Sequence, residues 1–292
     1  MFIKAIETAA GFTRAIHTIS RNFGSEKVTP GAATIFFVND EGYALTCKHV
    51  ADVLVQSAKI EKNYRAYKDE VLSNAQNPNK QNEIAIKYGL NSHAAIQLKS
   101  QFINCAEGIQ NMNIQVHPDY DLALLKFVNF QKLNINNFPV FKGDLTEIKQ
   151  GKSLCRLGYP FPEFNNFRYN PREDDIEWTK RGNTNSPQFP IDGMLTRFIG
   201  DAKGKVSGIE ISTPGLRGQS GGPLFDENGI IYGMQSRTKH LHLGFDLENK
   251  DIIVNGQKRA VNDYSFLHLG ECVHVGVIKD FLSKHGVRFS EG

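Results

Sequence analysis

Two β-hairpins of the same design, one in each half of the chain, constrain the fold more than any other feature of the sequence. In the first, ATIFFV leads into the turn 39–42 and out again as YALTCKHV. In the second, GGPLF leads into the turn 226–229 and out as IIYGMQS. Strand-forming residues on both sides of a polar turn that contains glycine are typical of antiparallel hairpins. Because similar short runs recur along the chain while long amphipathic helices are scarce, we predict a mainly β protein.

Two polar stretches and one amphipathic stretch complete this outline. Residues 56–113 are rich in Asn, Gln and Lys, and residues 161–190 are rich in Pro and carry the acidic patch 173–175. Both stretches predict insertions or long loops on the β scaffold, with an extra hairpin around EIAIKYG and a solvated loop at the acidic patch. The stretch VHVGVIKDFLSKHGV has apolar residues at helical spacing and predicts a short C-terminal helix.

Composition excludes several classes of function. The 292 residues suffice for two modest domains, and 34 Lys and Arg stand against 31 Asp and Glu without a long basic run. We therefore expect no nucleic-acid partner. The N-terminal stretch MFIKAIETAAGFTRAI is interrupted by Lys4, Glu7 and Arg14, and no long apolar run follows it. We expect neither a signal peptide nor a membrane partner.

The cysteines show neither a CxxC pair nor the spacing of metal ligands. They are Cys47, Cys105, Cys155 and Cys272. We expect buried free thiols, no metal and no cofactor. A chain without disulfides or a signal peptide suits a reducing compartment, which predicts a cytoplasmic location. His240 and His242 could share one face of a strand, but no third ligand stands at a fixed offset, so a metal site is not predicted there.

The segment GQSGGP at 218–223 carries the strongest chemical signal. Glycine-rich turns with a serine also occur where a backbone needs positive φ or close approach, so a purely structural turn is one interpretation. The other interpretation is catalytic. With glycines on both sides of Ser220, the backbone N–H groups of Gly218 and Ser220 can point at one spot, where an oxyanion would develop. Ser220 would then be the nucleophile.

The same segment satisfies G-x-S-x-G, the nucleophile elbow of α/β-hydrolases, so the motif alone leaves two enzyme classes open. An elbow needs a helix that starts at its serine, with the acid and then the histidine further along the chain. Here Pro223 and the second hairpin follow Ser220, and the remainder of the chain is short. We therefore disfavour the elbow. The alternative order, His, Asp, Ser, places two partner segments upstream.

Both partner segments are present in that order. LTCKHV delivers His49 from the end of the first hairpin, and HPDYDLALL places Asp121 directly before an apolar strand. Each has a plain structural interpretation by itself, since a histidine after a strand is usually structural and an aspartate there is usually a turn cap. Together they predict a catalytic triad, with His49 and Asp121 in the N-terminal half and Ser220 in the C-terminal half.

The three segments resemble the trypsin and chymotrypsin superfamily of serine peptidases, and in particular the bacterial trypsin-like peptidases of the HtrA kind. LTCKH is close to the family's L-T-A-A-H pattern, and DLALL matches its D-x-A-L-L pattern. The resemblance implies a mainly β, chymotrypsin-like double β-barrel with a short C-terminal helix. One barrel would span residues 14–145 with an insertion at about 56–113, and the other residues 146–285 with an insertion at about 161–190.

The resemblance also implies an activity and roles for the site residues. The protein would be a serine endopeptidase that hydrolyses peptide bonds through an acyl-enzyme. Ser220 would be the nucleophile, His49 the general base and then acid, and Asp121 the group that fixes the histidine tautomer. Gly218 and Ser220 would form the oxyanion hole. The primary substrate pocket would lie near Pro214 and along the strand that holds Tyr232, Gly233 and Met234. Since Pro214 is not acidic, we expect an apolar or small P1 residue.

At three positions the sequence departs from the family pattern, and each departure changes which family properties we expect here. Trypsin-type zymogens have an aspartate before the nucleophile, and this chain has Gln219, so we expect activity without N-terminal cleavage. Val50 follows His49 where animal trypsins often have a cysteine, so that disulfide is not expected. The chain ends shortly after LSKHG, so we expect neither a PDZ domain nor the assemblies that it supports.

One alternative comes from a different class of function. The chain could be a catalytically idle trypsin-like module that keeps its triad residues but binds peptides or partner proteins. In either case the expected ligand is a protein or peptide. Because an intracellular protease must be restrained, a regulatory protein partner or a conformational switch is also expected.

Overall fold

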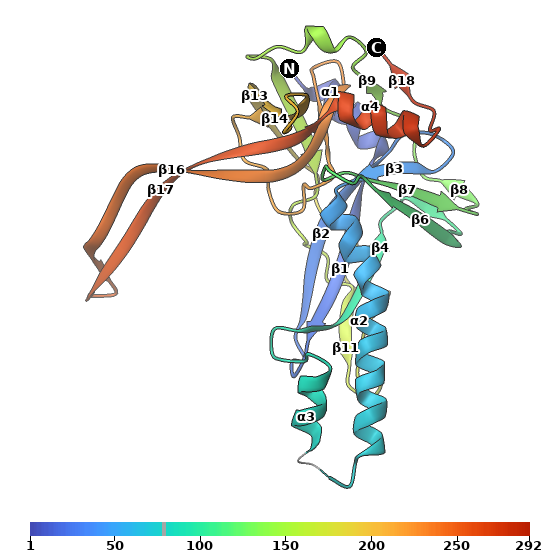
Figure 1. Cartoon of the computed structure of the whole chain (residues 1–292), viewed down its shortest axis with the longest axis vertical. Helices are drawn as coiled ribbons and strands as arrows, with labels where there is room; N and C mark the ends of the chain where they lie inside the picture. The colour runs from blue at the N-terminus through green and yellow to red at the C-terminus, as the bar shows by residue number, and fades with distance from the viewer. Residues whose placement is uncertain (78–79) are drawn as a thin grey trace.

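Two sheets form the framework of the protein, the first antiparallel throughout and the second antiparallel except at two short parallel pairings (Figure 1). The computed structural model describes residues 1–77 and 80–292. The first sheet has the strand order β4-β1-β2-β3-β7-β6, and its edge strands β4 and β6 are not paired with each other in the described chain. The sheet therefore curls without closing. Its strands are β1 (Thr13–Asn22), β2 (Val28–Phe37), β3 (Tyr43–Thr46), β4 (Ala95–Phe102), β6 (Asn111–Val116) and β7 (Ala123–Val128).

The second sheet closes into a barrel. Its order is β15-β10-β13-β14-β17-β16-β9-β18, and an additional pairing joins β15 to β16. Its strands are β9 (Val140–Phe141), β10 (Ser153–Gly158), β13 (Phe189–Gly200), β14 (Val206–Ile211), β15 (Pro223–Phe225), β16 (Ile230–Val254), β17 (Gln257–His274) and β18 (Ser290–Glu291). Shorter elements are β5 (Ala106–Glu107), β8 (Lys132–Leu133) and the 3-10 helix η1 (Leu145–Glu147).

The two predicted hairpins and the predicted C-terminal helix are present. In the pairing of β2 with β3, Phe36 stands opposite Leu45, and in that of β15 with β16, Pro223 stands opposite Met234. The helix is α4 (Val275–Lys284), and its apolar face is buried in the hydrophobic core. The mainly β fold with two curled sheets and a C-terminal helix is therefore confirmed.

One buried cluster joins the two sheets. Phe37 of β2 and Phe127 of β7 stack with ring centroids 5.3 Å apart. The same cluster includes Leu157 and Leu224 of the second sheet, together with Phe12 of the N-terminal helix α1 (Ile3–Phe12). Burying one such side chain stabilises a fold by roughly 1.5–3 kcal/mol. The cysteines are free and buried, as predicted.

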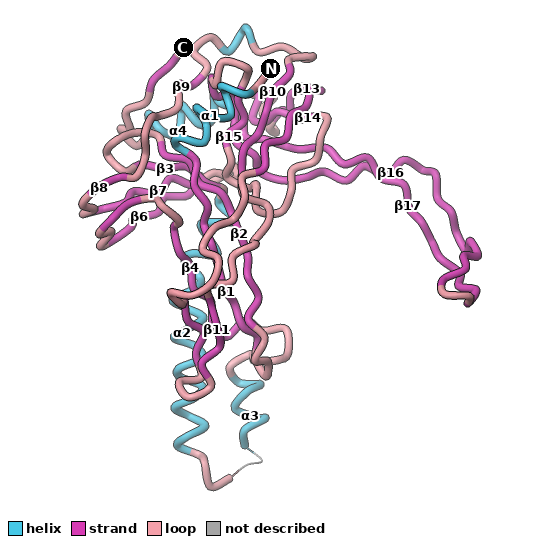
Figure 2. The backbone as a smooth tube through the Cα atoms, turned by 180° about the vertical axis from the view of Figure 1, so that it is seen from behind, coloured by secondary structure: helices cyan, strands magenta, loops and turns pink. Residues whose placement is uncertain are grey.

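The first predicted insertion is helical in large part, which corrects the expectation of loops. α2 (Lys48–Ser73) runs beside β4, and α3 (Lys80–Lys87) contains EIAIK, where a hairpin was expected (Figures 1 and 2). Over its 26 residues α2 buries only Val50, Ala51 and Tyr64. Because most of the helix faces solvent, it has no continuous apolar stripe for a sequence pattern to reveal.

The acidic patch is also not a solvated loop. β11 (Phe167–Asn170) and β12 (Asp175–Trp178) form a hairpin, and the Asp174 carboxylate in its turn contacts residues of two other elements. Its Oδ1 lies 2.6 Å from Nη2 of the buried Arg21, and its Oδ2 accepts a hydrogen bond of 2.6 Å from the hydroxyl of Tyr64. Asp174 therefore ties this insertion to β1 and α2.

β16 and β17 continue beyond the barrel as a long two-stranded arm (Figures 1 and 2). Their antiparallel pairing runs from Gly233 opposite His274 to Val254 opposite Gln257. The segment 236–240 of β16 lies where the arm leaves the barrel. Within the described residues, none of the helices has the length and apolar character needed to cross a membrane.

A buried histidine couples the stability of the first sheet to pH. His17 of β1 is fully buried, its ring stacks on Phe164 at a centroid distance of 3.9 Å, and its Nε2 lies 2.8 Å from Oγ of Ser186. Burial lowers the pKa of His17 to about 4. The folded protein thus keeps this imidazole neutral at pH values where the unfolded chain binds a proton.

We expect the variant His17→Gln to lose less stability in acid than the wild-type protein. The depressed pKa contributes stability that is present above pH 6.5 and is lost as the pH falls towards 4, up to about 3 kcal/mol. Urea unfolding at pH 7.5 and 4.5 measures the difference. The exposed His93→Gln is the matched control, and equal acid losses in His17→Gln and the wild type would contradict the prediction.

Candidate active site

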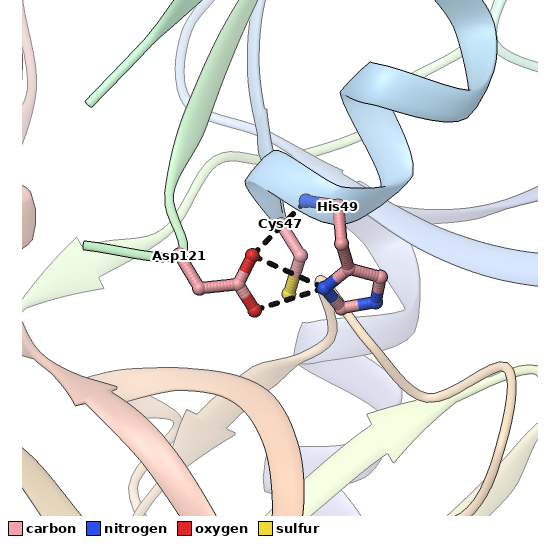
Figure 3. Close-up of side chains that lie close together, drawn as sticks. All are labelled: Cys47, His49 and Asp121. Atoms are coloured by element: carbon pink, nitrogen blue, oxygen red, sulfur yellow. Dashed lines mark hydrogen bonds and ion pairs between the residues drawn. The ribbon is translucent and has the colours of Figure 1, made fainter. Parts of the chain in front are cut away.

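His49 and Asp121 meet where two paired strands end. β3 ends at Thr46, which stands opposite Ala123 at the start of β7, so the residues just beyond these strands lie close together. Nδ1 of His49 lies 2.9 Å from Oδ2 and 3.1 Å from Oδ1 of Asp121 (Figure 3). The main-chain N–H of His49, in the first turn of α2, donates to Oδ1 at 3.0 Å. Three contacts therefore hold the ring against the carboxylate.

The contacts of His49 and Asp121 shift the pKa values of both residues. Burial acts to raise the pKa of Asp121, but hydrogen bonds from the His49 side chain and from Ser236 outweigh it and lower the pKa to about 2. The Ser236 hydroxyl donates to Oδ2 at 2.5 Å. The hydrogen bond to Asp121 in turn raises the pKa of His49 above 6.5, against the opposing effect of burial. No sequence motif marks Ser236, which is brought to the site by β16.

Ser220 lines the same cavity as His49. This cavity has a volume of about 510 Å³ and lies between the segments 214–217 and 235–238. Oγ of Ser220 donates to the carbonyl of Ser236 at 3.2 Å. Within the described residues it makes no hydrogen bond to His49. The structure thus brings His49 and Asp121 into contact and places Ser220 beside them, with its hydroxyl turned to another acceptor.

The backbone around Ser220 leaves two donors without an acceptor. Three neighbouring N–H groups donate to backbone carbonyls at 2.8–3.0 Å, namely those of Gln219, Gly221 and Gly222. In the part of the chain that the structure describes, the N–H groups of Gly218 and Ser220 have no intramolecular acceptor. Gly218 has φ +99°, and its carbonyl accepts a hydrogen bond of 2.7 Å from Thr34 Oγ1. These are the two donors that the sequence predicts for an oxyanion hole.

Gln219 occupies a buried position behind the nucleophile segment. Its side chain is fully buried, its Oε1 accepts from the Leu216 N–H at 3.0 Å, and its Nε2 donates to the Phe189 carbonyl at 2.9 Å. The uncharged amide is therefore satisfied by neutral backbone groups. A carboxylate there would require a cation to offset its burial, and Gln219 does not.

Gly221 is packed so tightly that we expect Gly221→Ala to cost about 3 kcal/mol or more of unfolding free energy. Its φ is +89°, and an added Cβ would lie 2.1 Å from the Thr34 carbonyl oxygen. Gly24→Ala is the matched control, because Gly24 has φ +73° but open space around it. We expect that control to lose only about 1 kcal/mol. Urea unfolding compares the two, and equal losses would show that the close contact is unimportant.

The predicted pocket residues are only partly in place. Pro214 lines the cavity, whereas Tyr232, Gly233 and Met234 do not, which is a correction. These three residues are central in the barrel, and a Cβ on Gly233 would lie 2.4 Å from the Val273 carbonyl oxygen. The wall is formed instead by the following residues, 235–238, because the strand leaves the barrel there at a bulge between Gln235 and Arg237.

Cys47 lies beside the pair and completes a cluster of potential metal ligands. The ligand atoms of Cys47, His49 and Asp121 lie within 4.8 Å of one another (Figure 3). Burial, followed by the charge of Asp121, raises the pKa of the Cys47 thiol well above its usual value. The thiol donates to the Gln235 carbonyl at 3.1 Å. A protonated, donating thiol does not fit a metal ligand, so we assign no metal to this cluster.

The comparisons with solved structures concern the fold. The HtrA-type protease AlgW with a decapeptide is 13% identical, with a TM-score of 0.50 over 97% of this chain and 66% of that chain. The Rv3671c protease from M. tuberculosis, in its active form, is 14% identical, with a TM-score of 0.46 over 99% of this chain and 89% of that one. This chain spans 62% of the length of a further AlgW chain. The likeness to AlgW supports the chymotrypsin-like fold, in which the first sheet of this chain curls without closing.

The comparison with sequence families concerns most of the chain. No curated protein matches the sequence. The family model described as the trypsin-like peptidase domain matches residues 33–234, which include His49, Asp121 and Ser220. This match covers more than half of the 292 residues. The chain therefore belongs to the trypsin-like peptidase family.

Proposed function

We propose that this protein is a serine endopeptidase that hydrolyses peptide bonds through an acyl-enzyme on Ser220. The observation that carries the proposal is the contact of His49 Nδ1 with Asp121 at 2.9 Å beside a cavity that Ser220 also lines. The other ring nitrogen, Nε2, points away from Asp121 (Figure 3). It is therefore available to take a proton from a serine hydroxyl.

The proposed reaction begins with a rotation of the Ser220 side chain away from the Ser236 carbonyl and towards His49. Such contacts are often loose without substrate. His49 Nε2 then takes the proton of Oγ as Oγ attacks the scissile carbonyl, and the free N–H groups of Gly218 and Ser220 stabilise the oxyanion. His49 returns the proton to the leaving amine, and water releases the acyl group by the same steps. Asp121 stays ionised throughout, as its low pKa allows.

Labelling with a fluorophosphonate probe tests this proposal. The probe should attach to Ser220, which peptide mapping by mass spectrometry locates, and Ser220→Ala should abolish the labelling. Ser153→Ala is the matched control, because Ser153 is an exposed serine in the same half of the chain. Heat-denatured protein should not be labelled. A folded protein that is never labelled, with or without peptide, would contradict the proposal and favour the idle binding module.

A further inference from the structure

The cavity beside Ser220 is lined by basic groups and by no carboxylate. Its walls are the segments 214–217 and 235–238, and it reaches His240 and His268 at the base of the arm. Among its lining residues are two arginines, Arg217 and Arg237, and no Asp or Glu. The neighbouring cavity, about 340 Å³ in volume, differs in this respect, because Asp119, Asp121 and Glu271 line it.

The two arginines of the first cavity differ in how their charge is used. Arg237 forms an ion pair with Glu271, whose side chain is only 10% exposed. Arg217 is exposed and forms no ion pair within the described residues. The charge of Arg217 is therefore free to attract an anion that enters the cavity.

A third guanidinium lies behind the wall of the cavity. Arg156 is fully buried and donates to Gln235 Oε1 at 2.6 Å, to Thr213 Oγ1 at 2.6 Å and to the Pro214 carbonyl at 3.1 Å. All these acceptors are neutral, and in the described chain Arg156 has no carboxylate within ion-pair distance. A buried charge without a counter-ion is costly, and its field extends far in a medium of low dielectric constant. Pro214 and Gln235, which accept hydrogen bonds from Arg156, line the cavity, and Asp192 offsets only part of the Arg156 charge from beyond ion-pair distance.

Two paired histidines form the far end of the cavity. His240 of β16 stands opposite His268 of β17, and their Nδ1 atoms lie 2.6 Å apart. Such a contact requires one Nδ1 to donate and the other to accept. The Nε2 atom of the accepting ring then carries the proton of that ring. A polar donor is thus present among the residues that line the cavity together with Ser220.

We propose that this cavity is the primary specificity pocket and that it takes an acidic P1 side chain, that of Glu or Asp. The inference rests on the proposed function and names the substrate class of the same site. It differs from the apolar or small P1 residue that the absence of an acid at Pro214 suggests by itself. The reason is that the decisive charges come from Arg217 and Arg156, whereas the sequence-based expectation considers only the residue at position 214.

Peptides that differ only at P1 test the proposal. We expect kcat/KM for a P1 Glu or Asp peptide to exceed that for the P1 Gln peptide by about tenfold or more, since Gln matches Glu in shape but lacks its charge. P1 Leu and P1 Arg complete the panel. Preferred cleavage after Leu or Arg would overturn the inference while leaving the serine endopeptidase intact.

Variants then assign the preference to the pocket. Arg217→Gln should lower kcat/KM for the P1 Glu peptide about tenfold more than it lowers kcat/KM for the P1 Gln peptide. Arg217→Gln combined with His240→Gln should reduce the preference further, and the preference that remains is the part contributed by Arg156. Lys239→Gln is the matched control, because successive side chains of a strand point to opposite faces and Lys239 does not line the cavity. An unchanged preference in the double variant would contradict the assignment.

A binding measurement separates this inference from the proposed function. Ser220→Ala keeps the pocket but removes the nucleophile, so product peptides that end in Glu or Gln can be compared by fluorescence anisotropy. Both peptides carry the same C-terminal carboxylate, and only the side chain differs. Tighter binding of the Glu peptide supports the pocket even if the protein never hydrolyses a peptide. Equal binding of the two peptides would overturn it.

Discussion

Ser220→Ala is expected to lower kcat for a cleavable peptide by about 10⁶-fold, the scale of such losses in serine peptidases. The reason is that in the proposed mechanism Ser220 and His49 act as one unit, since proton transfer to His49 is useful only when Ser220 attacks. The double variant Ser220→Ala, His49→Ala should therefore be no slower than Ser220→Ala alone. Single-turnover rates with a quenched fluorescent peptide measure both variants.

Substrate affinity provides the internal control for that experiment. Neither substitution removes the cavity walls at 214–217 and 235–238, so we expect substrate binding to change little while kcat collapses. Ser153→Ala should keep the full rate. A double variant that is another thousandfold slower than either single variant would show that the two residues act independently and would argue against a shared mechanism.

Asp121→Asn is expected to lower kcat by about 10⁴-fold. An asparagine oxygen can still accept from the main-chain N–H of His49, but its amide group donates towards Nδ1 and selects the wrong histidine tautomer. The loss should fall on kcat with the fold preserved, which thermal unfolding checks. The matched control is Asp119→Asn, two residues away on the surface. Equal activity of Asp121→Asn and the wild type would exclude Asp121 from the mechanism.

The pH profile of the same variant adds a second readout. In the proposed mechanism His49 must be neutral to accept the proton of Ser220, and its contact with Asp121 raises its pKa above 6.5. In the wild type kcat/KM should therefore rise with pH through a value above 6.5 and be lost below it. Removing the carboxylate charge should move this limb to lower pH. A limb that stays in place would show that another group limits the rate in acid.

The outline of the fold is readable in the sequence because it depends on short-range patterns. Each hairpin needs only strand-forming residues around a turn with glycine, and both hairpins form as predicted. The helix α2 was not predicted from the sequence. It buries only three of its 26 residues, so its apolar residues show little helical periodicity. The contacts of Asp174 could not be predicted for a different reason, because its partners Arg21 and Tyr64 are far away in the chain.

The residues of the candidate site also differ in how far the sequence predicts them. The triad residues stand in short segments whose residue types and order carry their own chemical meaning, so His49, Asp121 and Ser220 can be proposed without coordinates. The pocket residues have no such motif. The prediction of Tyr232 to Met234 lies too early along β16, because a bulge shifts the exposed wall to residues 235–238.

The sequence by itself thus identifies the β framework, the family and the three residues proposed for the chemistry, since each of these depends on local pattern or chain order. Only the tertiary structure shows that Ser236 supports Asp121, that the Ser220 hydroxyl is turned towards the Ser236 carbonyl, and that Arg156 lies behind the wall of the cavity beside Ser220. The physical reason is that electrostatic potential and hydrogen bonding depend on distances in space. The charges around this cavity come from segments that are far apart along the chain.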